Sequence, residues 1–190
     1  MKHWIPILMI AMAASLSAGE WHVDTNADNR VRFTSETFSL EFHGETDQID
    51  GYIYWEGEEM FLGKSQLQMD VDLNSLETGI GKRDRDMRET LETDKYPVTT
   101  YKGAITAVEP IDSTLSAWRV QSEGTILIHG VEQPLSVPAT VTVDDRGRMH
   151  VTARFEVKLT DFQIEVPSLM FLKVNENIRL YVDFYLREAS

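Results

Sequence analysis

Apolar and polar side chains alternate along several long stretches of the chain. Between positions 66 and 73 every apolar residue follows Gln or Asp, and the apolar residues are Leu67, Met69, Val71 and Leu73. The same period of two runs through 137–143, 149–159 and 178–187. Successive side chains of a β-strand point to opposite faces, so each stretch is predicted to be a strand with one face toward a core. Such alternation is typical of antiparallel sheets.

Further strands are predicted at 21–24, 29–35, 38–43, 48–56, 97–107 and 117–128. Two segments carry turn signals between strands: Asp144-Asp145-Arg146-Gly147, which predicts a hairpin loop, and 129–134, which contains a glycine and a proline. No linker or repeat divides the chain, which indicates a single domain. This many long strands favours a closed barrel, because closure removes unpaired sheet edges. The strand pattern therefore predicts an all-β fold with an antiparallel barrel.

One segment, 83–92, departs from the strand pattern. Met87 and Leu91 stand four residues apart, and Asp84–Arg88 and Arg85–Glu89 have the spacing of helical ion pairs. The segment is predicted to be a short amphipathic helix. Ten residues are too few for a helix to be stable alone, so we expect it to pack across the barrel or its mouth.

The first 18 residues predict export. A short polar start is followed by an apolar run from Trp4 to Ala14 and then by small residues, the layout of a secretory signal peptide. The run is shorter than the ~20 residues that span a bilayer. We therefore expect the signal to be removed, leaving a periplasmic or secreted domain of residues 19–190 without stable membrane insertion.

Composition narrows the function further. The formal net charge is −13 at pH 7, with 31 acidic against 18 basic residues, which argues against nucleic-acid binding and against docking on anionic lipid. The chain has no cysteine, so disulfides, thiolate metal sites and a cysteine nucleophile are excluded. The oligomeric state stays open, with a dimer as one alternative.

Candidate catalytic groups are few. Histidines follow the signal segment at positions 22, 43, 129 and 150, without a metal-ligand spacing. Asp84 and Asp86 alternate with arginines, which favour ionised, paired carboxylates over general acid–base work. We expect neither a metal nor a catalytic site, and a hydrolase or isomerase that uses Asp84, Asp86 or His129 is the least favoured alternative.

The segment 162–172 ends in four consecutive apolar residues after Pro167. Two interpretations remain: an apolar plug or lid at a cavity, with Phe162, Met170 and Phe171 as ligand contacts, or a core-filling loop that caps one barrel end. A methionine suits the first, because its flexible side chain adapts to irregular surfaces.

Three blocks resemble, in order, the signatures of the YceI family of lipocalin-like proteins. The first is Ser-Leu-Glu-Thr-Gly-Ile-Gly-Lys-Arg-Asp at 75–84, followed by Thr-Asp-Lys-Tyr-Pro at 93–97. The second is a strand that ends in His-Gly-Val at 129–131, and the third is Thr-Asp-Phe at 160–162. The resemblance begins at Trp21 and extends over the rest of the chain.

The resemblance implies an eight-stranded barrel that holds a polyisoprenoid chain, or a prenylated quinone, without catalytic activity or a cofactor of its own. The inward strand positions are then the expected ligand contacts: Ile53, Trp55, Leu67, Met69, Val71, Phe155, Val157, Leu180, Val182 and Phe184. Two positions depart from the family pattern: Asp86 stands where relatives often carry histidine, and Gln163 replaces the glycine after Asp-Phe.

The number of strands is compatible with two alternatives for the barrel interior. About eight strands enclose a space that is either filled by side chains or able to hold one small ligand. An open interior predicts a carrier or sequestering protein with an apolar lipid partner. A filled interior predicts a non-catalytic interaction or stress-related structural module, and a bulky 164–172 segment behind Gln163 favours that alternative.

Overall fold

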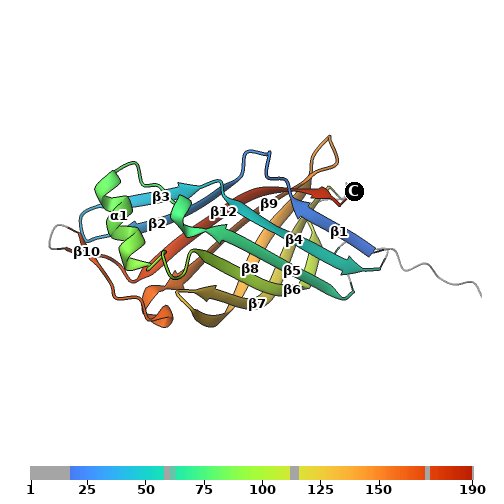
Figure 1. Ribbon diagram of the computed structural model, residues 1–190. Coiled ribbons are helices and arrows are strands. Elements are labelled where there is room, and N and C mark those ends of the chain that lie inside the picture. Colours follow the sequence, from blue (N-terminus) through green and yellow to red (C-terminus); the bar gives the residue numbers. More distant parts are fainter. Residues whose placement is uncertain (1–17, 58–60, 62, 112–115, 170–171, 190) are drawn as a thin grey trace, which may run out of the picture.

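A computed structural model describes residues 18–57, 61, 63–111, 116–169 and 172–189. Strands dominate this part of the chain, with one α-helix and two short 3₁₀ turns (Figure 1). The strands are β1 (Ala18–Val23), β2 (Arg30–Glu36), β3 (Glu41–Thr46), β4 (Ile49–Glu56), β5 (Ser65–Asp72), β6 (Val98–Pro110), β7 (Ala117–Ile128), β8 (Val131–Val143), β9 (Met149–Lys158), β10 (Ser168–Leu169), β11 (Leu172–Lys173) and β12 (Asn177–Glu188).

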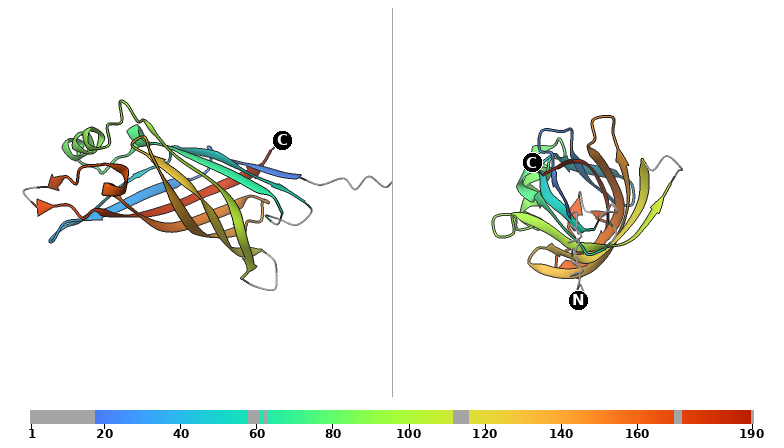
Figure 2. Two further views of the ribbon diagram at one scale, coloured as in Figure 1. Left: turned by 90° about the horizontal axis from the view of Figure 1, so that it is seen from below. Right: turned by 90° about the vertical axis from the view of Figure 1, so that its right-hand side faces the viewer.

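The main sheet closes on itself. Its strand order is β1-β4-β5-β6-β7-β8-β9-β12-β2-β3, and β1 also pairs with β12. Strands β1 and β2 both run antiparallel to β12, so they form two halves of one long strand, which turns at 24–29. Strands β3 and β4 likewise form one bent strand opposite them. The described strands therefore make a closed, eight-stranded antiparallel barrel, as predicted, and Figure 2 shows it end-on.

The turn between β7 and β8 is shorter than the predicted 129–134. His129 and Gly130 form it alone, with φ angles of 53° and 75°, the left-handed region that two-residue hairpin turns require. The residues after them are already in β8. Its prolines, Pro134 and Pro138, are tolerated because β8 pairs with β9 only from Ala139 onward, which leaves the first part of β8 with an unpaired edge.

The helix α1 (Gly81–Thr90) begins and ends two residues before the predicted 83–92. No residue on it is buried. The predicted side-chain pairs are replaced by others: Lys82 pairs with Asp86 at 2.6 Å, while Arg88 donates to the backbone oxygens of Asn74 and Leu76. The helix lies at the end of the barrel opposite the start of β1 (Figure 1). It lies beside the barrel mouth, as expected.

The core falls into two clusters. The larger one centres on side chains such as Ile53, Met149 and Leu186 from the barrel strands. The smaller one joins Ile126 to Phe162 and Ile164, which follow or belong to the turn η2 (Leu159–Phe162). This second cluster packs against the parts of β8 and β9 that are not paired with each other.

Candidate functional site: an apolar cavity in the barrel

A cavity of about 330 Å³ lies inside the barrel. Inward side chains of nearly every long strand line it, and α1 adds Arg83, Asp86, Met87 and Thr90 at one end. At the other end Phe61 is 1% exposed and packs its ring edge-on against Trp55, with centroids 5.1 Å apart. The volume lies within the range of small-ligand sites. The interior is therefore open, and the filled-barrel alternative is not favoured.

Most of the side chains predicted as ligand contacts line this cavity. They are Ile53, Leu67, Met69, Val71, Phe155, Val157, Phe162, Leu180, Val182 and Phe184. Phe162 belongs to η2, and the other residues lie on four strands, where the period-two pattern identified the inward face correctly. Their contact with a ligand stays a prediction.

Three predicted contacts stand apart. Trp55 is buried but does not belong to the cavity lining, because Phe61 covers it from the interior. The alternation places Trp55 on the inward face, and the sequence offers no sign that Phe61 packs over it. Met170 and Phe171 lie outside the described residues.

The departure at Gln163 does not close the cavity. Its φ angle is 58°, in the left-handed region that favours glycine, and its side chain is exposed. The next residue, Ile164, is buried and lines the cavity together with Pro167 and Ser168. Residues 159–168 therefore form part of the cavity lining without filling the interior.

Two polar side chains lie deep among the apolar ones. The Tyr101 hydroxyl lies 3.1 Å from Ser122 Oγ and donates to the backbone oxygen of Leu135. Ser122 Oγ in turn donates to the backbone oxygen of Val137. Burial raises the pKa of Tyr101 above its ordinary value. Protein groups thus satisfy both hydroxyls, as buried polar groups require.

The cavity end beside α1 is more polar. Arg83 donates through one terminal nitrogen to the backbone oxygen of Thr78 at 2.8 Å, and its guanidinium lies 5.0 Å from the centre of the Phe42 ring. The Thr78 hydroxyl donates to Asp84, and this hydrogen bond is the main cause that lowers the pKa of Asp84. Asp86, the other position that departs from the family pattern, lines the cavity, and its carboxylate pairs with Lys82.

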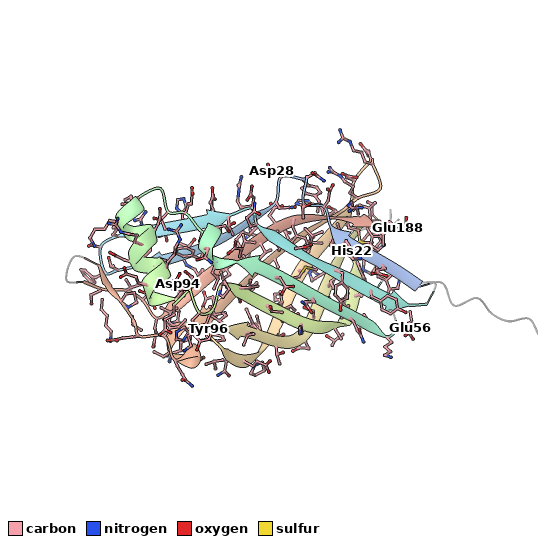
Figure 3. The ribbon with its side chains drawn as sticks, in the orientation of Figure 1. His22, Asp28, Glu56, Asp94, Tyr96 and Glu188 are labelled. Carbon is pink, nitrogen blue, oxygen red and sulfur yellow. The ribbon has the colours of Figure 1, made fainter. Side chains whose placement is uncertain are left out.

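The three candidate catalytic residues do not meet in the cavity. Asp86 lines it, whereas Asp84 and His129 are outside the lining. His129 Nδ1 lies 3.2 Å from the backbone oxygen of Phe162, and its ring packs edge-on against Tyr96. His22 lies at the other end of the barrel from Tyr96 (Figure 3). Among the described residues no group of His, Asp and Glu could hold a metal ion.

Several lining residues were missed from the sequence. They include Val31, Phe33 and Ser35 of β2, and Val137, Ala139 and Val141 of β8. The same alternation marks both sets, but which side faces inward becomes clear only once each strand is paired. Phe42 has no such signal, because the predicted strand 38–43 is shifted from β3.

A closed barrel of eight antiparallel strands around an apolar cavity defines a lipocalin-like fold. Residues 21–186 match the family model of the YceI-like domain, and the chain belongs to this family. No curated protein matches the chain. In the described part of the chain, no helix is both long and apolar enough to cross a membrane.

Solved structures share the fold at low identity. A polyisoprenoid-binding domain from Saccharophagus degradans aligns with a TM-score of 0.69 and 19% identity, over 89% of this chain and 98% of its own. BcnA of Burkholderia cenocepacia aligns with a TM-score of 0.68 and 15% identity, over 86% and 98%.

Proposed function

We propose that this protein binds a polyisoprenoid, a prenylated quinone or a similar apolar molecule in its barrel, as an extracytoplasmic carrier or sequestering protein. The observation that carries the proposal is the cavity of about 330 Å³ lined by apolar side chains. Membership of the YceI-like family supports it. A structural neighbour described as polyisoprenoid-binding supports it further.

The energetics suit a lipid chain. Each methylene group that leaves water contributes ~0.8 kcal/mol, so a chain of about 15 carbons supplies roughly 12 kcal/mol. Association costs at least ~4 kcal/mol in lost freedom of movement. The remainder is at most about 8 kcal/mol, which corresponds to a dissociation constant of about 1 μM for the lowest association cost and a weaker one for higher costs. A dry apolar interior is thus sufficient for binding.

Export is part of the proposal. The polar start, apolar run and small residues of the first 18 positions support a signal peptide. N-terminal sequencing of the protein isolated from its host is expected to begin near Gly19. A mature chain that retains Met1 and stays in the cytoplasm would contradict the extracytoplasmic role and leave the binding proposal standing.

Lipid binding is tested by displacement. The purified protein is titrated with N-phenyl-1-naphthylamine, a dye that fluoresces in apolar cavities, and then with farnesene, a prenyl hydrocarbon. We expect dye fluorescence to rise on binding and farnesene to displace the dye at micromolar concentration. No dye uptake, or uptake that farnesene leaves unchanged, would contradict the proposed function.

A further inference from the structure

Two buried polar atoms at the α1 end of the cavity have no hydrogen-bond partner among the described residues: Ser35 Oγ and Arg83 Nε. Both residues line the cavity. Ser35 is only 2% exposed. A buried donor without a partner costs about 1–3 kcal/mol, so such groups are uncommon unless something else satisfies them. They contrast with Tyr101 and Ser122, whose hydroxyls are partnered within the protein.

Ser35 and Arg83 have a common neighbour, Phe42. Ser35 on β2 stands directly opposite Phe42 on β3 in the strand register. The Arg83 guanidinium lies over the ring of the same Phe42, 5.0 Å from its centre. Two hydrogen-bond donors from distant parts of the sequence therefore flank one aromatic side chain at the cavity end.

The charge of Arg83 has no carboxylate partner among the ion pairs of the described residues. Its helical neighbours are engaged elsewhere: Asp84 accepts from Thr78, and Asp86 pairs with Lys82 at 2.6 Å. One terminal nitrogen of Arg83 is held by the backbone oxygen of Thr78, which fixes the guanidinium and leaves Nε–H unused. A fixed cationic donor and a serine hydroxyl that line the same cavity and both neighbour Phe42 suit an anionic acceptor.

We propose that Ser35 Oγ–H and Arg83 Nε–H form a head-group subsite that binds the carboxylate of a long-chain or isoprenoid acid whose apolar chain fills the barrel. The subsite rests on the proposed function and names its ligand class. The carboxylate accepts from both donors and pairs with the guanidinium charge. The serine hydroxyl reaches the carboxylate by rotating about its side-chain bond.

The test compares three probes with the same chain: farnesoic acid, methyl farnesoate and farnesene, at a pH at which the free acid is ionised. Their dissociation constants come from displacement of N-phenyl-1-naphthylamine. We expect farnesoate to bind at least tenfold more tightly than farnesene, with the ester between them. Ser35→Ala is expected to reduce this ratio about fivefold to tenfold.

Two more variants separate head-group binding from folding. Arg83→Lys keeps the positive charge but lacks the Nε–H donor, and we expect it also to reduce the ratio. Ser136→Ala removes an exposed serine hydroxyl on β8, and we expect it to leave the ratio unchanged. Circular dichroism checks that each variant keeps its strand content.

The outcomes are distinct. Equal affinity for farnesoate and farnesene, or a ratio that Ser35→Ala leaves unchanged, would overturn the subsite and leave the lipid-binding proposal intact. Tighter binding of the ester than of the acid would also overturn it, because the ester accepts hydrogen bonds without a charge. Failure of all three probes to displace the dye would overturn both proposals.

Discussion

One carboxylate oxygen of Asp84 accepts two hydrogen bonds from Thr78, from the backbone N–H at 2.8 Å and from the hydroxyl. The residue just before α1, Ile80, provides no side-chain cap. The Thr78–Asp84 pair therefore ties the first turn of the helix to the loop before it. Because Arg83 donates to the backbone oxygen of the same Thr78, this contact also positions the polar end of the cavity.

The first prediction concerns acid stability. Hydrogen bonding from Thr78 lowers the pKa of Asp84, so the carboxylate stabilises the fold when it is ionised. This contribution is fully present above the unfolded value of about 4 and is lost as pH falls through the lowered pKa. Asp84→Asn is expected to cost about 1–2 kcal/mol at neutral pH and to flatten the loss of stability below pH ~4.

Urea unfolding at a series of pH values measures this effect. The matched control is Asp86→Asn, which removes only an exposed ion pair with Lys82 and is expected to change the free energy of unfolding by less than ~1 kcal/mol. Equal losses in the two variants at every pH would contradict the role assigned to the Thr78–Asp84 contact.

A second prediction concerns the cavity itself. Ala153 is buried and lines the interior, so Ala153→Phe places a ring in the space that the ligand needs. We expect the affinity for farnesene to fall at least tenfold, with a cost to stability of no more than about 1–3 kcal/mol. The control, Ala107→Phe, enlarges an exposed side chain on β6. Dye displacement measures the affinity and thermal melting measures the stability of both variants. Undiminished farnesene binding by Ala153→Phe would place the ligand outside this cavity.

A third prediction follows from the backbone at Gln163. Its left-handed conformation disfavours a side chain by ~1–2 kcal/mol, and its side chain is exposed. Gln163→Gly is therefore expected to raise stability slightly, by up to ~1 kcal/mol. Glu165→Gly, at a nearby exposed residue without a positive φ angle, is expected to lower it. Thermal melts of the two variants that shift in the same direction would refute this explanation.

A fourth prediction concerns the helix face. Met87 lines the cavity, but no residue of α1 is buried. Met87→Asp is therefore expected to weaken farnesene binding by about tenfold, because it places a charge beside the apolar chain, while the melting temperature changes little. The same substitution at exposed Arg85 is expected to leave farnesene affinity unchanged. A large fall in melting temperature for Met87→Asp would show that the helix packs into the core.

The sequence predicted the barrel and much of its lining because period-two alternation directly reports strand faces. Leu67, Met69 and Val71 are inward for that reason. It did not predict that Phe61 covers Trp55, since no periodic pattern marks the position of Phe61 between β4 and β5. Nor did it predict the Ser35–Phe42–Arg83 arrangement, which requires the register of β2 with β3 and the placement of α1.

The most direct measurement is native mass spectrometry of the protein purified from its host without detergent, followed by organic extraction. The account predicts a species heavier than the bare chain, with an extractable apolar molecule that carries an isoprenoid or similar long chain. Only the mass of the bare chain, together with no uptake of farnesene or farnesoate on incubation, would contradict the claim that this barrel holds a lipid.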